Sequence, residues 1–339
     1  MSKENYLVSF VIPIYNTNVN KFNNCIESLK HVSGFKYECV VIDDGSDEIL
    51  SAQYQKICND KGAIYWRKPN AGVSAARNDG INLSNGKYVY FLDSDDELID
   101  NAFNNVNVVQ QQYDLILSKM EVILQNHKSI KCEILDKDSE ITTKRAFEAM
   151  LKDSFLNGPY CKLIKKEFLQ KNCIRFKQEV KNGEDLDFFL QILACNPTIF
   201  YSNLLSYRYN YELNTRRNRV IKEPERCLND AAIVNESILN TAKTINGLDP
   251  TKIEEQLLRE HICGIFGDAS NIIIFSDNGI TRNQKDLYMN EMKKISISKC
   301  GRIEFPIVLK YYLVKNGMWR LISFISYLRK FYLTRKNHI

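Results

Sequence analysis

Residues 85–96 read NGKYVYFLDSDD, and this stretch decides how the rest of the chain is interpreted. Residues 88–92 are all aromatic or branched and uncharged, and they lie between a glycine turn and a group of carboxylates. Such a run is typical of a strand that is covered on both faces of a parallel sheet. Asp93, Asp95 and Asp96 would then follow the carboxyl end of the strand, where open α/β sheets bind ligands.

Adjacent carboxylates repel one another, so this cluster lowers stability unless a cation is present. A divalent ion that bridges to phosphate oxygens is one solution, because Mg²⁺ and Mn²⁺ prefer hard oxygen ligands. The alternative is a solvated acidic turn that precedes a helix after Asp100. Motifs elsewhere in the chain favour the metal-binding interpretation.

Composition sets the broad class of the protein. The chain has 339 residues, of which 44% are hydrophobic and 26% charged, so it suits one large or two ordinary domains. Its net charge of +5 is modest, and it lacks a zinc-finger spacing or a basic, aromatic strand pair, so we expect no nucleic acid partner. The ten cysteines contain no CxxC pair, which indicates a reduced, cytoplasmic protein. We expect neither a signal peptide nor a membrane-spanning segment.

Strands and helices alternate along the first hundred residues. Apolar runs predict strands at residues 7–14, 37–42, 63–66 and 88–92. Helical spacing predicts helices at residues 19–29 and 47–60, and a third that begins within 70–78. This order predicts an α/β fold with a Rossmann-like, doubly wound, mostly parallel sheet.

The remainder of the chain is predicted to be more helical. Helices are expected at 101–112, 142–151, 162–172 and 186–194, and strands at 114–124 and 198–205. From residue 223 the pattern is helical, with Pro224 at a first turn and a break at 246–247. We therefore predict an α/β domain over residues 1–220 and a helical C-terminal region over 221–339.

Five motifs follow one another in the predicted α/β domain: LVSFVIPIYN (7–16), VVIDDGS (40–46), NAGVSAARN (70–78), YFLDSDDELI (90–99) and GED (183–185). In this order they resemble glycosyltransferase family 2, whose members have the GT-A fold. The resemblance implies a nucleotide-sugar half at 1–100 and an acceptor half at 101–220. It also implies transfer of a sugar from a nucleoside diphosphate with inversion, assisted by Mn²⁺ or Mg²⁺.

The resemblance assigns donor-site roles to the acidic motif. Asp93 and Asp95 match the DxD element, which in this family holds the ion on the diphosphate and contacts the ribose. Asp95 is the preferred metal ligand, Asp93 a ribose contact or supporting residue, and Asp96 an adjacent alternative ligand. A bound cation would stabilise the charge that develops on the leaving diphosphate.

Further donor contacts are implied at the ends of the first two strands. Asp44 aligns with the aspartate that accepts a hydrogen bond from uracil, and Asp43 is an alternative that could equally cap the next helix. Pro13 and Tyr15 would form a wall for the base, although Pro13 suits a core or turn position as well.

The NAGVS motif adds two more donor-site candidates. Gly72 would let the loop approach the nucleotide closely. Arg77 is expected near the base and phosphates, because a planar guanidinium binds such groups better than a lysine does. The alternative for Arg77 is an ion pair with a nearby carboxylate.

The GED motif implies the catalytic base. Asp185 would take the proton of the acceptor hydroxyl, and Glu184 would support it. A carboxylate at a helix amino end is kept ionised by the helix dipole, although simple N-capping would require the same residue. Lys162 has no assigned role, and Arg208 could reach the phosphates or be a surface charge.

The sequence thus predicts a metal-dependent hexosyltransferase. It would move sugar from a UDP-sugar to a saccharide or lipid-linked saccharide acceptor in surface polysaccharide synthesis. One alternative is a nucleotidyltransferase, but residues 15–19 (YNTNV) are not the basic, Gly-rich loop that class requires. A non-catalytic sugar-binding scaffold is the other, and it would be expected to lack Asp95 or Asp185.

The last 35 residues have an unusual charge pattern. Residues 305–339 contain no acidic side chain, and their lysines and arginines are Lys310, Lys315, Arg320, Arg329, Lys330, Arg335 and Lys336. One face of a helical wheel carries Met318, Leu321, Phe324, Ile325, Leu328 and Tyr332. This pattern predicts a peripheral contact with an anionic membrane surface. The alternative is that the apolar face packs on the catalytic domain.

Overall fold

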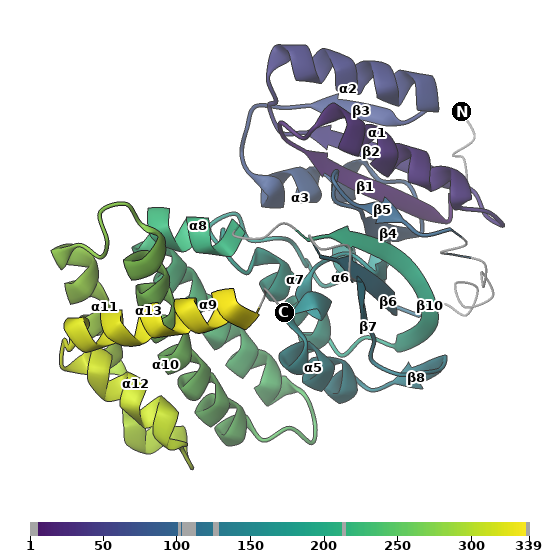
Figure 1. The fold of residues 1–339 in the computed structure, drawn as a ribbon. Helices are drawn as coiled ribbons and strands as arrows, with labels where there is room; N and C mark the ends of the chain where they lie inside the picture. Colours follow the sequence, from purple (N-terminus) through teal and green to yellow (C-terminus); the bar gives the residue numbers. More distant parts are fainter. Residues whose placement is uncertain (1–5, 101–102, 104–112, 125–128, 212–214, 337–339) are drawn as a thin grey trace. The chain divides into compact units, whose positions relative to one another are not determined.

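The computed structural model describes residues 6–100, 103, 113–124, 129–211 and 215–336 (Figure 1). The chain divides into two compact units. The first unit comprises residues 1–212 and 244–247, and the second comprises 213–243 and 248–339.

The first unit ends earlier than the boundary predicted near residue 220. That position lies inside α8 (Thr215–Lys222), a helix that packs on α10 (Pro250–Phe275) of the second unit. Val220 is buried in the hydrophobic core of the second unit, and burying this side chain ties α8 to that unit.

Four parallel strands form the first half of the sheet. They are β1 (Val8–Ile14), β2 (Tyr37–Asp43), β3 (Ile64–Arg67) and β4 (Tyr88–Phe91), in the order β3-β2-β1-β4. Helices α1 (Val19–Ser28), α2 (Glu48–Lys61) and α3 (Val73–Leu83) connect them. These elements agree with the predicted alternation to within two residues at each end.

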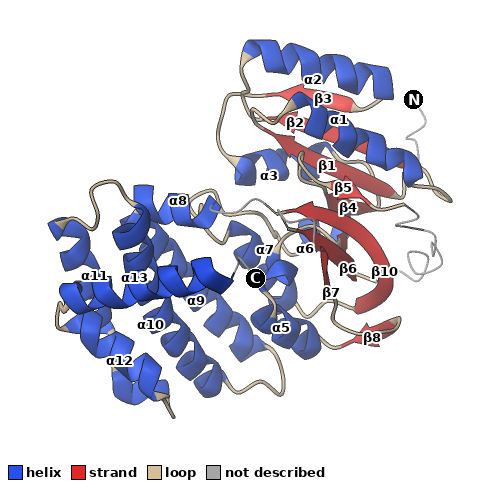
Figure 2. Cartoon of the chain, in the orientation of Figure 1, coloured by secondary structure: helices blue, strands red, loops and turns tan. Residues whose placement is uncertain are grey.

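Helices cover both faces of this half of the sheet (Figure 2). Because side chains alternate along a strand, Cys39 and Val41 of β2 face the core that α1 and α2 complete. Val40 and Ile42 face the other side, against Ala76 of α3. The predicted doubly wound α/β arrangement is therefore confirmed.

The second half of the sheet is mixed. β6 (Leu115–Ile123) and β10 (Ile199–Asn210) are parallel, and β9 (Lys162–Lys165) runs antiparallel between β4 and β6. Short strands β5 (Glu97–Leu98), β7 (Ser129–Cys132) and β8 (Ser139–Ile141) pair at its margins. Helices α5 (Thr143–Lys152), α6 (Lys166–Lys171) and α7 (Glu184–Ala194) lie between these strands in sequence.

The prediction of a single helix over residues 162–172 is wrong for its first part. Residues 162–165 form β9, because they fill the space between β4 and β6 and satisfy the backbone of both. Only residues 166–171 are helical. The helix predicted at 101–112 lies outside the described residues, apart from Phe103.

The second unit is helical, as predicted. It contains α8, α9 (Pro224–Thr244), α10, α11 (Arg282–Lys294), α12 (Phe305–Lys315) and α13 (Trp319–Lys336). α13 packs on α10 through Ile322 and Ser326, and the Ser326 hydroxyl donates to Ser270 Oγ at 2.9 Å. No helix in the described part of the chain is long and apolar enough to cross a membrane.

The predicted apolar face of the tail is largely exposed. Met318, Leu321, Phe324 and Leu328 are each between 40% and 60% exposed. Ile325 is partly buried against the core of the second unit, and the side chain of Tyr332 lies outside the description. α13 is therefore held by Ile322 and Ser326, which lie outside the predicted face, together with Ile325, which belongs to it.

Candidate active site

The loops after β1, β2 and β4 meet at one edge of the sheet, because these strands are parallel. Asn16 N donates to Ser46 Oγ at 3.0 Å, which joins the loops after β1 and β2. The hydroxyls of Thr17 and Ser94 lie 2.7 Å apart, which joins the loops after β1 and β4. The predicted donor-site residues of these three loops are thereby brought together, at the position where open α/β sheets bind ligands.

The two carboxylates after β2 hold the local backbone. Asp43 is fully buried and accepts hydrogen bonds from Ser46 N, the Ser51 hydroxyl and the Tyr65 hydroxyl. Burial alone would raise the pKa of Asp43, but these donors hold it below its usual value. Asp43 thus anchors the start of α2, which is the alternative that the sequence left open.

Asp44 fixes the start of α3. Its two carboxylate oxygens accept from Ala71 N at 3.0 Å and Gly72 N at 2.7 Å. Gly72 has φ +91°, a conformation that glycine adopts without strain. Asp44 therefore links the end of β2 to the loop that carries Gly72. A carboxylate oxygen has a second lone pair, so uracil recognition by Asp44 stays a prediction.

The remaining residues of the first strand differ in their environments. Pro13 is a buried residue within β1, paired in register with Ile42. Tyr15 follows the strand and is 54% exposed at this edge of the sheet, so its ring is accessible to a ligand.

Arg77 joins the two most important acidic motifs. Its guanidinium donates from Nη2 to Asp93 at 2.9 Å and from Nη1 to Asp185 at 2.5 Å. The Arg77 side chain is only 4% exposed. Burial lowers the pKa of this group, but the charges of Asp185 and Asp93 raise it above its usual value. The ion-pair alternative for Arg77 is therefore present, and it places the DxD motif beside the GED motif.

The carboxylates after β4 have unequal surroundings. Asp96 is buried, and its oxygens accept from the Tyr207 hydroxyl and from Asn210 N, both at 2.7 Å. Burial and the charges of Asp93 and Asp95 raise the pKa of Asp96 well above its usual value. Asp96 is thus engaged in the protein interior, whereas Asp93 and Asp95 are partly exposed.

Asp93 and Asp95 suit a divalent ion that is shared with a diphosphate. In the described residues, no group of three or more His, Cys, Asp or Glu side chains is placed to hold a metal ion by itself. Mg²⁺ bound to nucleotides typically takes one or two protein carboxylates, with phosphate oxygens and water completing the shell. Two partly exposed carboxylates, of which Asp93 is paired with Arg77, fit a site of that kind.

Asp185 begins α7. Gly183 precedes this helix with φ +93°, and Glu184, Asp185 and Asp187 form its acidic first turn. The helix dipole favours negative charge at that end. The loss of water around Asp185 raises its pKa, and the Arg77 guanidinium opposes the rise. A carboxylate with a raised pKa and 29% of its side chain exposed has the properties of a general base.

The structure corrects the prediction that Arg208 could reach the phosphates from a loop. Arg208 lies within β10, where its Nε donates to Glu121 at 2.7 Å and its Nη1 lies 3.7 Å from Glu97. Both acidic partners belong to neighbouring strands, so Arg208 is part of an ion-pair group of the sheet.

Sequence reasoning missed the residues that surround the acidic motif from β10. Tyr207 donates to Asp96 and accepts from Asp93 N at 3.2 Å. Asn210 also donates from its side chain to the carbonyl of Asp95 at 2.8 Å. These residues lie more than a hundred positions after the motif, beyond the strand predicted at 198–205. The alternation of tyrosines with polar residues at 207–210 is the signal that could have placed them on a strand.

Part of the chain matches a known protein family. Residues 9–172 match the family described as Glycosyl transferase family 2. This part of the chain is a family 2 glycosyltransferase domain. It contains β1 to β4 and the carboxylates that follow them, and the fold of the first unit is the GT-A fold that the motifs predicted.

Relatives of the chain extend the similarity beyond this domain. TarP of Staphylococcus aureus, a poly(ribitol-phosphate) β-N-acetylglucosaminyltransferase, is 29% identical over 61% of this chain and 63% of its own length. A poly(ribitol-phosphate) β-glucosyltransferase of Bacillus spizizenii is 31% identical over 60% of this chain and 32% of its own. An uncharacterized glycosyltransferase of Rickettsia bellii is 43% identical over 28% of this chain. The match spans only 14% of that relative.

A solved structure is similar over nearly the whole chain. Residues 1–349 of S. aureus TarS, in complex with UDP, superpose with a TM-score of 0.65 at 18% identity, covering 96% of this chain and 91% of TarS 1–349. The same TarS fragment with UDP-GlcNAc gives a TM-score of 0.63. The fold of both units is therefore shared with these chains.

Proposed function

We propose that the protein is an inverting glycosyltransferase that moves a hexose from a UDP-sugar to a surface polymer. The observation that carries this proposal is the Arg77 guanidinium, which contacts a carboxylate of the DxD motif and Asp185 in the first turn of α7. Asp93, which would bind the donor, and Asp185, which would activate the acceptor, are therefore adjacent. The family 2 domain supports the same reaction class.

The names of the relatives indicate which donor and acceptor to propose. Two of them are named as transferases that add a β-linked sugar to poly(ribitol phosphate), and a third, GgaB of Bacillus subtilis, as a minor teichoic acid biosynthesis protein. A β-linkage is the product of inversion at an α-linked nucleotide sugar. We therefore propose UDP-GlcNAc or UDP-glucose as the donor, and a polyol phosphate polymer as the acceptor.

In this mechanism Asp185 removes the proton of the attacking acceptor hydroxyl. Its Oδ1 is held by Arg77, so the second oxygen is the one oriented to receive the proton. Glu184 adds negative charge to the same helix end and supports Asp185 from α7. Arg77 keeps the two acidic motifs together while the donor is bound.

On the donor side, Asp44 and Tyr15 would bind the uracil base, and Asp93 and Asp95 would hold Mn²⁺ or Mg²⁺ on the diphosphate. The bound ion would supply charge stabilisation for the departing UDP. Gly72 would allow the loop before α3 to approach the nucleotide.

Acceptor-dependent release of UDP tests this proposal. The protein would be incubated with UDP-GlcNAc or UDP-glucose, Mn²⁺ and poly(ribitol phosphate), and the free UDP would be measured. We expect UDP release that depends on the polymer. Release of the sugar 1-phosphate instead of UDP would indicate a nucleotidyltransferase, and donor binding without turnover over a panel of polyol and saccharide acceptors would indicate a scaffold.

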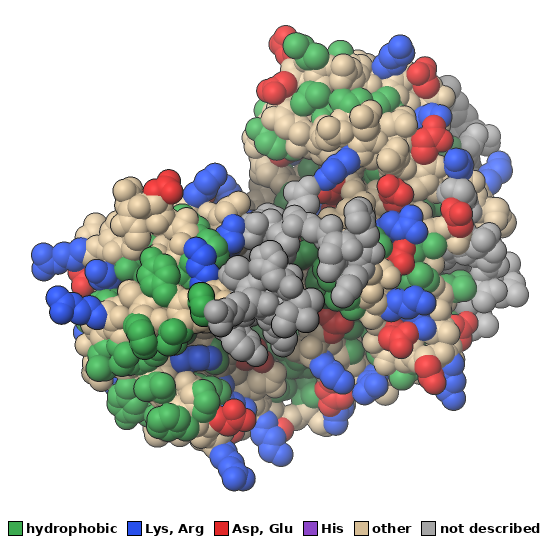
Figure 3. All heavy atoms as spheres, viewed as in Figure 1, with side chains coloured by type: hydrophobic (Ala, Val, Ile, Leu, Met, Phe, Trp, Pro, Cys, Tyr) green, Lys and Arg blue, Asp and Glu red, His purple; other side chains and the backbone are tan. Residues whose placement is uncertain are grey.

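We also propose that α12 and α13 contact an anionic membrane surface on its cytoplasmic side. Figure 3 shows hydrophobic side chains gathered with Lys and Arg in the region of these helices. Large apolar side chains are exposed along them: Phe305, Leu309, Tyr312, Met318, Leu321, Phe324, Tyr327, Leu328 and Phe331. Since residues 305–339 carry basic but no acidic side chains, an anionic lipid headgroup is the complementary partner.

A further inference from the structure

The acidic motif after β4 forms a tight turn in which burial alternates from residue to residue. Asp96 N donates to the carbonyl of Asp93 at 3.0 Å, and this bond closes the turn. Ser94 and Asp96 are buried, whereas Asp93 and Asp95 are partly exposed. The turn therefore divides its four residues into two pairs. One pair is enclosed by the protein, and the carboxylates of the other pair remain accessible to a divalent ion.

Strand β10 provides hydrogen-bond partners for all three aspartates of this turn. The Tyr207 hydroxyl donates to Asp96 at 2.7 Å and accepts from Asp93 N at 3.2 Å. Asn210 N donates to the other carboxylate oxygen of Asp96 at 2.7 Å. The Asn210 side chain donates to the carbonyl of Asp95 at 2.8 Å. Both oxygens of the buried carboxylate thus accept from β10, and the backbone on either side of Ser94 is connected to the same strand.

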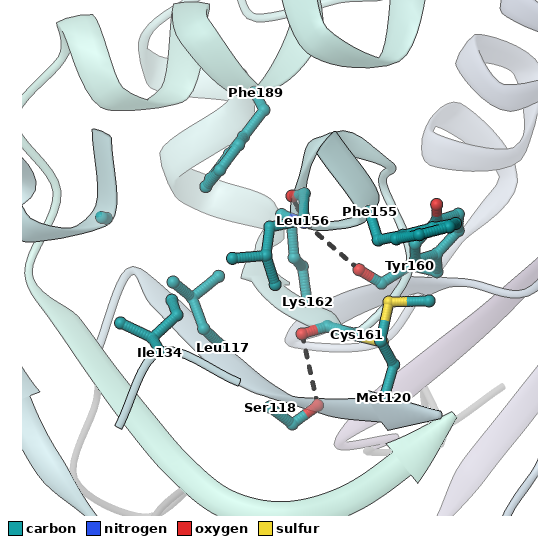
Figure 4. A pocket seen from close by; sticks show the side chains of 11 residues that line it. Leu117, Ser118, Met120, Ile134, Phe155, Leu156, Tyr160, Cys161, Lys162 and Phe189 are labelled. Carbon is teal, nitrogen blue, oxygen red and sulfur yellow. Dashed lines mark hydrogen bonds between the residues drawn. The ribbon is translucent and has the colours of Figure 1, made fainter. Parts of the chain in front are cut away.

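Tyr207 is itself fixed by the packing around it. Its ring is fully buried and stacks on the ring of Tyr160, with 4.9 Å between the ring centres. Tyr160 precedes Cys161 in the segment that leads into β9 (Figure 4). Ser118 of β6 donates to the carbonyl of Cys161 from its backbone N at 3.0 Å and from its hydroxyl at 3.3 Å. The support of the Tyr207 ring is therefore attached to the sheet, and the position of the Tyr207 hydroxyl is well defined.

We infer that Tyr207 and Asn210 are positioning residues for the divalent ion that Asp93 and Asp95 would hold. They act through Asp96 and through the backbone of the turn, which they keep in the conformation that exposes both ligand carboxylates together. This inference rests on the proposed function. A small divalent ion requires its oxygen ligands at nearly fixed distances. Replacing a residue that orients metal ligands typically lowers the affinity for the metal by about 10- to 100-fold.

Tyr207→Phe tests the inference, because it removes the hydroxyl and leaves the ring that stacks on Tyr160. UDP binding would be measured by calorimetry over a range of Mn²⁺ concentrations and in EDTA. We expect the Mn²⁺ concentration that gives half-maximal UDP binding to rise about tenfold or more. UDP affinity in EDTA should stay the same, because the proposed contacts of the base with Asp44 and Tyr15 do not involve this turn.

Tyr90→Phe is the matched control. The Tyr90 ring is also buried, and its centre lies 6.5 Å from that of Tyr207. Its hydroxyl lies 3.2 Å from Ser206 Oγ, outside the acidic turn. This variant should require the same Mn²⁺ concentration as the wild type.

Asn210→Ala is a second test of the same role. It removes the side-chain donor to the carbonyl of Asp95, while the backbone donor to Asp96 stays in place. We expect it to raise the Mn²⁺ requirement without changing UDP affinity in EDTA. If Tyr207→Phe does not fold, Asn210→Ala decides.

Three results would overturn the inference. The first is a wild-type Mn²⁺ requirement in the folded Tyr207 variant, and the second is an equal rise in Tyr90→Phe. The third is an equal loss of UDP affinity with Mn²⁺ and in EDTA, which would indicate a general disturbance of the fold. A wild-type protein that binds UDP equally well with and without Mn²⁺ would instead contradict the metal site of the proposed function.

Discussion

Arg77 is the residue on which the ligand-free site depends. It is buried and holds Asp93 and Asp185, which would otherwise face each other with like charge. Removing one partner of a buried charge group is costly, because the remaining charges keep their desolvation penalty. Changes at Asp185 are therefore interpretable only if the variant keeps the shape of the carboxylate, as an amide does.

Asp185→Asn should lower turnover by about 100-fold or more, the usual scale for a positioned base. The amide cannot accept the proton of the acceptor hydroxyl, but it retains an oxygen that can accept from Arg77. UDP affinity, measured by calorimetry, should remain close to that of the wild type. Wild-type turnover at saturating substrates would show that the base is another residue.

Asp95→Asn should weaken Mn²⁺-dependent UDP binding while the fold survives. The amide keeps the shape of the side chain but removes a charge from a crowded group of carboxylates, so the ligand-free protein loses repulsion. Binding would be measured with and without Mn²⁺. Asp60→Asn, at an exposed carboxylate near the end of α2, is the control. Unchanged UDP affinity in saturating Mn²⁺ would show that Asp95 is not a metal ligand.

At the scale of elements, the sequence predicts a strand or a helix best where the hydrophobic pattern of the segment fits only one of the two. β1, β2 and β4 are apolar runs that end in polar motifs, so both the strands and the meeting of their loops could be anticipated. β9 could not, because the apolar pair Leu163 and Ile164 also fits a helix. Its strand form depends on β4 and β6, which come from distant parts of the chain.

The same limit applies to the site. The carboxylates were predictable because they are local motifs, whereas their partners Tyr207 and Asn210 arrive through the pairing of β10 with β5 and β6. Lys162 is a further case. Its ammonium is buried and donates to the carbonyl oxygens of Leu156 and Gly158, which nothing local to the sequence indicates.

The stability of β9, and of the turn at residues 156–160 that precedes it, should depend on pH through Lys162. Burial lowers the pKa of Lys162 to about 8, below the value of about 10.4 for an unfolded chain. Between these two values the unfolded state binds more protons, so the contribution of Lys162 to stability rises with pH. In urea unfolding at pH 7.5 and 9.5, the free energy of unfolding of the wild type should rise relative to that of Lys162→Met. The rise should be at most about 1.4 kcal/mol per pH unit. A difference that does not vary with pH would contradict the lowered pKa.

At the scale of the whole molecule, the C-terminal helices that we propose contact a membrane are also part of the core of the second unit. Tyr311, Val314 and Ile322 belong to the core of the second unit, so α12 and α13 are structural elements of it. Deleting the chain after Glu304 would remove these side chains from the core and destabilise the unit. Membrane binding is therefore better tested with substitutions of exposed residues than with a truncation.

Phe324→Ser with Leu328→Ser should reduce binding to anionic vesicles by about tenfold or more. Each of these side chains is more than half exposed, and burial of such a group in lipid contributes about 1.5–3 kcal/mol. The basic residues nearby would contribute about 1 kcal/mol each, so wild-type binding should weaken with salt. Co-sedimentation with phosphatidylglycerol vesicles at low and high salt would measure both effects. Ile49→Ser, an exposed apolar residue of α2, is the control. Equal binding by all proteins, or none by the wild type at low salt, would mean that this surface does not contact lipid.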